Sequence, residues 1–241
     1  MRAVALIPAA GMGKRMGTLI SKPFLPIGNR PILAETLLRF EESSLISEVY
    51  VIVSSKEEGH SREDIVNKYN LKKVTKIVIG GVERQDSVKN GLDAIEPGCD
   101  IVMIHDGIRP FVTPQLIDES IIETQKHDAT VVAVPVKETV KRVSYYGEIL
   151  ETLDRNRLWL AQTPQTFNYD IIISAHKNAV ENNLRGTDDS SLVEALGIKV
   201  RIIAGSYGNI KITTPEDLIL AKAFLEDNEH MVSACEPINI G

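Results

Sequence analysis

The sequence predicts an α/β fold in which helices cover both faces of a mostly parallel β-sheet. Short runs rich in valine and isoleucine recur along the chain, and consecutive positions are apolar, as is typical of strands buried on both faces. Amphipathic segments of helical length lie between these runs, so right-handed crossovers can join parallel strands. The expected strands are 3–8, 49–54, 76–79, 101–105, 130–136 and 199–204.

Three helices are indicated by apolar spacing together with residues suited to helix starts. Pro31 suits the first turn of the first helix. Thr113 is the expected N-cap of the second helix, and a proline follows it. Thr214 repeats this arrangement in the third helix, where Asp217 can reach back to the cap. These helices are expected over 31–40, 113–127 and 214–226.

One segment, 137–153, breaks the alternation and is expected to form a β-hairpin with its turn at 145–147. It carries too few apolar residues for a core of its own, and an isolated two-stranded ribbon is marginally stable in water. We therefore expect it to project as an arm and to pack against a second subunit. The remaining chain is expected to form one domain, 1–226, followed by a polar tail, 227–241, that frays.

Composition excludes several classes of protein. The 241 residues carry a net charge of −6, so a general basic surface for nucleic acid is not expected. No apolar run approaches the roughly 20 residues of a membrane helix. The apolar run 3–10 follows Arg2 like a short secretion signal, but Pro8 interrupts it, and a buried strand explains it better. Cys99 and Cys235 lack metal-type spacing, which favours free thiols and a cytoplasmic location.

The loop after the first strand, "LIPAAGMGKRMG", combines small residues with positive charge. It fails the dinucleotide-binding pattern, since Met16 replaces the third glycine, and it lacks the Gly-Lys-Ser/Thr of a P-loop. Small side chains allow a ligand to approach the backbone N–H groups, and Arg15 and Lys22 add charge suited to a polyphosphate. A tight turn with solvated charges explains the same residues, so the loop alone decides nothing.

Further blocks accompany this loop in a fixed order. They are "SKPFLPIGNRPIL", "GGVERQDSVKNGL" (80–92), "HDGIRPFV" (105–112), "VPVKETVKRV" (134–143), "LDRNRLWLAQTPQTF" (153–167), "GTDDSSLVEALG" (186–197) and "GNIKITTPEDL" (208–218). Together they resemble the 2-C-methyl-D-erythritol 4-phosphate cytidylyltransferase family of the non-mevalonate isoprenoid pathway. The resemblance runs from residue 3 to about 224 and implies a Rossmann-like nucleotidyltransferase fold.

The resemblance implies a transfer of the cytidylyl group of CTP to a methylerythritol phosphate, with release of pyrophosphate. The sugar phosphate oxygen attacks the α-phosphorus in line, so the protein has to position two anions and supply positive charge. Mg²⁺, held largely through the CTP phosphates, would neutralise further charge and orient the leaving group. A homodimer with active sites completed across its interface is also implied.

The family pattern implies roles for individual residues. Catalytic roles fall to Arg15, Lys22, Arg155 and Lys211. Nucleotide contacts fall to Ala9, Ala10, Gly11, Gly13, Lys14, Gly81, Arg84, Ser87 and Asp106. Contacts to the methylerythritol phosphate fall to Arg109, Thr139, Arg155, Thr163 and Thr187, the arm residues Thr139 and Arg155 reaching into the partner's site. The carboxylate of Asp106 is suited to hold either Mg²⁺ or a sugar hydroxyl, and the sequence leaves open whether it binds the metal directly.

Structural alternatives stay open at several positions. Ser87 suits a helix cap as well as a base contact, and Arg84 suits a structural ion pair. "TDDSSLVE" also suits a capped helix start, and His105 suits a packed structural histidine better than a general base.

Other functions compete with the favoured one. A cytidylyltransferase for ribitol 5-phosphate or another polyol phosphate would share several of these blocks, although "DRNRLW" and "TDDSSLVE" favour methylerythritol phosphate. A non-catalytic nucleotide-binding module would keep the fold but lose some of the charged residues, of which Arg15, Lys22, Asp106 and Lys211 are all present. A dehydrogenase is the weakest alternative because of Met16.

Overall fold

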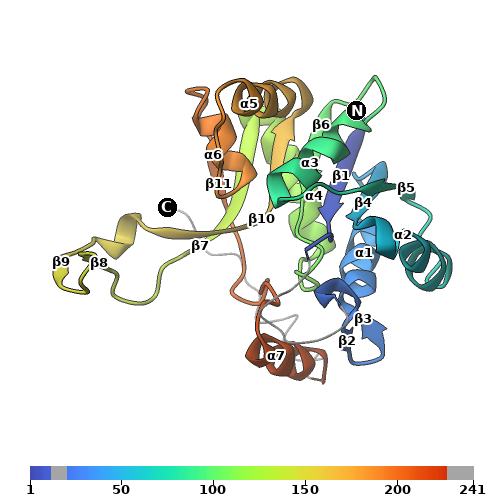
Figure 1. The fold of residues 1–241 in the computed structure, drawn as a ribbon, viewed down its shortest axis with the longest axis horizontal. Coiled ribbons are helices and arrows are strands. Elements are labelled where there is room, and N and C mark those ends of the chain that lie inside the picture. The colour runs from blue at the N-terminus through green and yellow to red at the C-terminus, as the bar shows by residue number, and fades with distance from the viewer. Residues whose placement is uncertain (12–20, 227–241) are drawn as a thin grey trace.

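A seven-stranded sheet forms the centre of the computed structural model, which describes residues 1–11 and 21–226 (Figure 1). The six expected strands are confirmed with ends shifted by one or two residues at most. β1, β4, β5 and β6 are mutually parallel, and so are β7 and β11. In sheet order the strands are β11 (Arg201–Ala204), β7 (Ala129–Pro135), β10 (Trp159–Asn168), β6 (Ile101–Ile104), β1 (Ala3–Pro8), β4 (Glu48–Val53) and β5 (Val74–Ile79).

The seventh strand, β10, is antiparallel to both of its neighbours and was missed from the sequence. Its sequence, "WLAQTPQTFN", contains a proline and several polar residues and so lacks the apolar run typical of a buried strand. The pairing of β10 with β7 shifts register between Ala161 and Gln165, which accommodates the proline between them. The interrupted strand brings Gln162 and Thr163 to the edge of the sheet where the site lies.

Helices cover both faces of the sheet, as expected. Apolar residues of α1, η3 and α4 pack with Ala3, Ala5 and Ile7 of β1 on one face. Residues of α3, α5 and α6 pack with Val4 and Leu6 of the same strand on the other. The bounds are α1 (Ile32–Glu42), α2 (Glu58–His60), the π-helical η3 (Ser61–Asn67), α3 (Arg84–Asp93), α4 (Pro114–His127), α5 (Tyr169–Glu181) and α6 (Asp189–Glu194). None of the described helices is long and apolar enough to cross a membrane.

The helix starts agree with the sequence at two of three places. Thr113 caps α4 by accepting a hydrogen bond from an amide of the first turn. Asp217 of α7 (Pro215–Glu226) accepts from the amide of Thr214 at 2.9 Å, as expected. The placement of Pro31 was wrong by one residue, because it lies at the N-cap with extended backbone (ψ 148°) and also ends β3. The short elements near it are η1 (Lys22–Phe24), β2 (Pro26–Ile27), β3 (Arg30–Pro31) and η2 (Ser55–Glu57).

The hairpin expected over 137–153 is confirmed and projects away from the sheet (Figure 1). It consists of β8 (Lys141–Val143) and β9 (Ile149–Thr152), and all residues of both strands are exposed. Gly147 adopts a φ of 83° in the turn, a conformation that favours glycine. The short helix η4 (Arg155–Arg157) links the arm to β10.

Candidate active site

The carboxyl ends of the parallel strands meet at one edge of the sheet, where α/β folds bind ligands. Ala9, Ala10 and Gly11 follow β1 there, and Gly80 follows β5. A side chain at Gly80 would come within 2.8 Å of the Ala10 side chain, so glycine is required for this close approach. The glycine pair at 80–81 and the first loop therefore lie against each other, as a nucleotide site shared between them requires.

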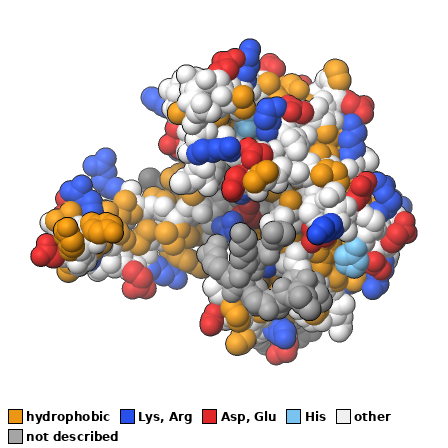
Figure 2. All heavy atoms as spheres, viewed as in Figure 1, with side chains coloured by type: hydrophobic (Ala, Val, Ile, Leu, Met, Phe, Trp, Pro, Cys, Tyr) orange, Lys and Arg blue, Asp and Glu red, His pale blue; other side chains and the backbone are white. Residues whose placement is uncertain are grey.

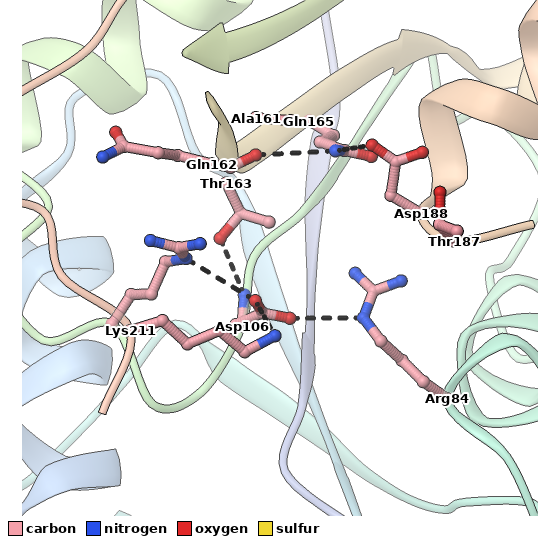
Figure 3. A pocket seen from close by; sticks show the side chains of 10 residues that line it. Arg84, Asp106, Ala161, Gln162, Thr163, Gln165, Thr187, Asp188 and Lys211 are labelled. Carbon is pink, nitrogen blue, oxygen red and sulfur yellow. Dashed lines mark hydrogen bonds and ion pairs between the residues drawn. The ribbon is translucent and has the colours of Figure 1, made fainter. Parts of the chain in front are cut away.

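A polar pocket of about 260 Å³ opens at this edge (Figure 3). Six residues that the sequence analysis assigned to the site line this pocket, namely Arg84, Asp106, Arg109, Thr163, Thr187 and Lys211. These residues come from five separate stretches of the chain. The pocket also has a lining that was not foreseen, formed by Ala161, Gln162, Gln165 and Asp188.

Asp106 is the centre of the pocket, and cations approach it from three directions. Arg84 Nε donates to Oδ1 at 3.2 Å, whereas Lys211 Nζ lies 2.8 Å and Arg109 Nε 3.5 Å from Oδ2. Figure 3 shows Arg84 and Lys211 pointing at the carboxylate from opposite sides. Burial raises the pKa of Asp106, but the charges of the three cations outweigh it and hold the pKa well below its usual range. The pocket therefore has a fixed anion surrounded by an excess of positive charge.

Arg84 connects this pocket to a second buried carboxylate, Asp189, which the sequence analysis missed. The guanidinium donates to Asp189 Oδ2 at 2.7 Å, and His176 Nε2 lies 3.4 Å from Oδ1. Burial lowers the pKa of Arg84, but Asp189 and Asp106 raise it above its ordinary value. The ion-pair interpretation of Arg84 is thus supported by the structure. Asp189 belongs to the "TDDSSLVE" block, whose helix start is capped by the preceding Asp188.

Arg109 and Thr163 are fixed by buried hydrogen bonds. Arg109 donates to the carbonyl of Asn209 at 2.8 Å, and burial lowers the pKa of its guanidinium. Thr163 Oγ1 accepts from the Asp106 amide at 3.1 Å. The Asn209 amide in turn donates to the Thr163 carbonyl at 2.9 Å. Asn209, 1% exposed, was not identified from the sequence, because only the fold brings it to these partners.

Ser87 fixes the glycine pair rather than capping a helix. Its hydroxyl accepts from the Gly81 amide at 3.0 Å and donates to the Glu83 carbonyl at 3.0 Å. Glu83 is the N-cap of α3, so the cap interpretation of Ser87 was wrong. The hydroxyl thereby fixes the backbone expected to contact the base.

The other expected site residues lie elsewhere. Gly13, Lys14 and Arg15 fall outside the described residues. Lys22 is buried in η1, and its ammonium donates to the Thr213 carbonyl at 3.0 Å, two residues beyond Lys211. Thr139 and Arg155 are exposed. The arm to which they belong projects away from the sheet (Figure 1).

His105 is a packed histidine, as the sequence favoured. Its ring is fully buried between Thr163 Oγ1 at 3.2 Å and the Arg109 carbonyl at 3.0 Å. Burial lowers its pKa to about 4. We take it to hold the Asp106–Arg109 turn in place and not to exchange protons with substrate.

This lowered pKa predicts an acid-dependent loss of stability. Below pH ~6.5 the unfolded chain binds a proton at His105 that the folded chain excludes, so stability falls as the pH decreases toward 4. The expected contribution is about 2–3 kcal/mol. Urea denaturation between pH 7.5 and 4 measures it, with His105→Gln as the comparison. An equal pH dependence in the variant would contradict the assignment.

The described residues contain no group of three or more histidine, cysteine or acidic side chains that could hold a metal ion. Both oxygens of Asp106 are already occupied by cations. The donor set of this part of the chain therefore does not fit a metal held by the protein alone.

Comparison with known proteins is consistent with this geometry. A family model described as 2-C-methyl-D-erythritol 4-phosphate cytidylyltransferase matches residues 3–227. A protein of that name from Clostridioides difficile is 50% identical over 91% of this chain and 92% of its own length. Another from Geobacter metallireducens is 49% identical over 94% of this chain and 99% of its own length. The crystal structure of 4-diphosphocytidyl-2C-methyl-D-erythritol synthase from Anaerococcus prevotii superposes with a TM-score of 0.83 at 32% identity, covering 93% of this chain and 96% of that one.

Proposed function

The chain belongs to the 2-C-methyl-D-erythritol 4-phosphate cytidylyltransferase family, and we propose that its substrates meet in the Asp106 pocket of one subunit beneath the arm of another. The enzyme transfers the cytidylyl group of CTP to 2-C-methyl-D-erythritol 4-phosphate and releases pyrophosphate, a step of isoprenoid biosynthesis. The main support for the proposal is that three cations converge on Asp106. CTP and the sugar phosphate are both anions, and fixed positive charge is needed to bring them together and to stabilise the transition state. The polyol-phosphate and non-catalytic alternatives are not favoured by a match of this length.

Within this pocket each cation has a proposed task. Lys211 stabilises charge at the α-phosphorus, and Arg109, with Thr163 and Thr187, holds the acceptor phosphate. Asp106 orients Lys211 and contacts the nucleotide, since its carboxylate is fixed against the sheet edge. No proton transfer through a buried base is needed, because a phosphate monoester oxygen is already a nucleophilic anion near neutral pH.

The nucleotide occupies the two loops that meet at Gly80. The backbone at Gly81, which the Ser87 hydroxyl holds in place, and the Arg84 side chain are proposed to contact the base and ribose. Ala9, Ala10, Gly11, Gly13 and Lys14 give the triphosphate access to the backbone, with Arg15 and Lys22 at the reacting phosphates.

Mg²⁺ is proposed to arrive on the triphosphate, since the described residues provide no carboxylate cluster for it. When bound it neutralises phosphate charge and orients the leaving pyrophosphate. A cytoplasmic location completes the proposal, and it is supported by Cys99, a buried free thiol.

The arm is proposed to join two copies of the chain. Figure 2 shows apolar side chains gathered on the projecting arm, and the exposed ones include Val143, Tyr145, Tyr146, Ile149 and Leu150. Tyr145 is 98% exposed, which a soluble surface rarely tolerates beside four other large apolar residues. Packing against a second copy buries them and carries Thr139 and Arg155 to a pocket that lacks them.

Mixing two inactive variants tests the shared site. Lys22→Ala removes a group proposed to act beside the pocket, and Arg155→Ala removes a group of the arm. Heterodimers isolated through two different tags contain one intact pocket facing one intact arm, so up to half of the wild-type pyrophosphate release per dimer is expected. Lys141→Ala, which removes a lysine of the arm without a proposed role, is the control and should stay active alone. Verified heterodimers that show no recovery would mean that each chain completes its own site.

A further inference from the structure

The turn after β11 connects the arm of a subunit to that subunit's own pocket. β11 runs parallel to β7 with Ala204 opposite Ala133, and the Gly205 amide donates to the Ala133 carbonyl at 2.8 Å. The chain then continues beside Pro135, the last residue of β7, after which the arm begins. The register of the sheet thereby places Tyr207 at the root of the arm.

Tyr207 holds this root by two contacts. Its hydroxyl donates to the Pro135 carbonyl at 2.7 Å, and Lys137 Nζ lies 3.5 Å from the centre of its ring. Arg155, from the returning side of the arm, donates to the Lys137 carbonyl at 2.8 Å. The departing segment of the arm therefore contacts Tyr207 directly, and the returning segment is linked to it through Lys137. Its side chain is 38% exposed, so filling the core does not explain it.

The other end of the same turn is fixed in the pocket. The Asn209 carbonyl accepts from Arg109 at 2.8 Å, and the Asn209 amide donates to the Thr163 carbonyl. Lys211 pairs with Asp106 two residues later. Because Asn209, Arg109 and Thr163 are buried and hydrogen-bonded, the turn provides a rigid base for Tyr207.

We propose that Tyr207 is a positioning residue, which sets the direction in which the arm leaves the sheet and so places Thr139 and Arg155 in the pocket of the partner subunit. This inference rests on the proposed sharing of active sites. Thr139 lies two residues beyond Lys137, and Arg155 contacts the backbone of Lys137, so a small rotation at the root displaces both. The effect of Tyr207 then acts across the interface, on the neighbouring pocket.

Heterodimers of Lys22→Ala and Arg155→Ala chains show whether Tyr207 acts on its own pocket or on that of its partner. In such a heterodimer the Lys22→Ala chain supplies the working arm and the Arg155→Ala chain supplies the working pocket. Tyr207→Ala is added to one chain at a time. In the arm-supplying chain it is expected to raise the KM for methylerythritol phosphate about tenfold, from the loss of one hydrogen bond and one cation–π contact, with the KM for CTP unchanged. In the pocket-supplying chain it should change neither constant. Tyr69→Ala, which also removes a ring beneath a lysine, is the matched control.

Two conservative variants separate positioning from folding. Tyr207→Phe keeps the ring beside Lys137 and Lys137→Met keeps the side-chain length, so each should show part of the KM increase without a change in melting temperature. An equal effect from either chain, or no effect from the arm-supplying chain, would overturn the role of Tyr207. A reference heterodimer that is inactive without the tyrosine change would instead overturn the shared site and this inference with it.

Discussion

Replacing Lys22 by alanine is expected to lower kcat by roughly 10²–10³-fold, the loss typical for one group that stabilises charge in a transition state. The ammonium is buried in η1 and donates to the Thr213 carbonyl at 3.0 Å. That carbonyl lies two residues beyond Lys211, which reaches Asp106. Lys22 thus supplies charge beside the pocket from a position where water does not screen it fully. Steady-state pyrophosphate release at saturating substrates measures the effect.

Two further variants show whether charge or packing is lost. Lys22→Met retains the buried stem and should lose as much kcat as Lys22→Ala, with a melting temperature near that of the wild type. Lys56→Ala, at an exposed lysine in η2, should remain within about twofold of the wild type. A variant that only raised KM, with kcat preserved, would show that Lys22 binds the ground state and does not act in the chemical step.

The parallel strands could be predicted because each satisfies a local rule. The run at 101–104 is apolar at successive positions, and such a run is stable only when both faces are covered. β10 violates that rule, since Gln165 and Thr166 are buried and polar and gain their stability from partners that the fold supplies. A strand stabilised by tertiary hydrogen bonds leaves no periodic pattern in the sequence.

The same distinction separates the site residues that were found from those that were missed. Arg84, Asp106 and Lys211 could be proposed because they stand in sequence blocks that resemble the family. Asp106 and Lys211 lie in loops beyond strands, where charged residues often bind ligands, and Arg84 begins α3. Asp189 and Asn209 act through buried contacts to Arg84 and Arg109. Their role depends on residues about a hundred positions away, which spacing cannot indicate. The doubled aspartate of "TDDSSLVE" was the one available signal, since one carboxylate suffices for a helix cap.

Asp106→Asn is expected to lower stability by about 3 kcal/mol, because it removes the anion that Arg84, Arg109 and Lys211 share. Because asparagine has nearly the same shape as aspartate, the substitution removes the negative charge between the cations without creating a cavity. Lys211 then loses the carboxylate that holds it, and a displacement of about an ångström typically costs 10²-fold in turnover. Urea denaturation and pyrophosphate release give the two quantities.

Asp100→Asn is the matched control. Asp100 precedes β6 and Asp106 follows it, but the Asp100 carboxylate is 60% exposed and lies outside the pocket. It should cost less than about 1 kcal/mol. Binding of inorganic pyrophosphate tests more directly whether Asp106 balances the charge of the pocket. With one negative charge removed, the Asp106→Asn pocket should bind inorganic pyrophosphate more tightly than the wild-type pocket, so pyrophosphate should raise its melting temperature by the larger amount. An Asp106→Asn protein that is less stable but gains nothing from pyrophosphate would show that the carboxylate supports the fold and not the charge balance on which anion binding depends.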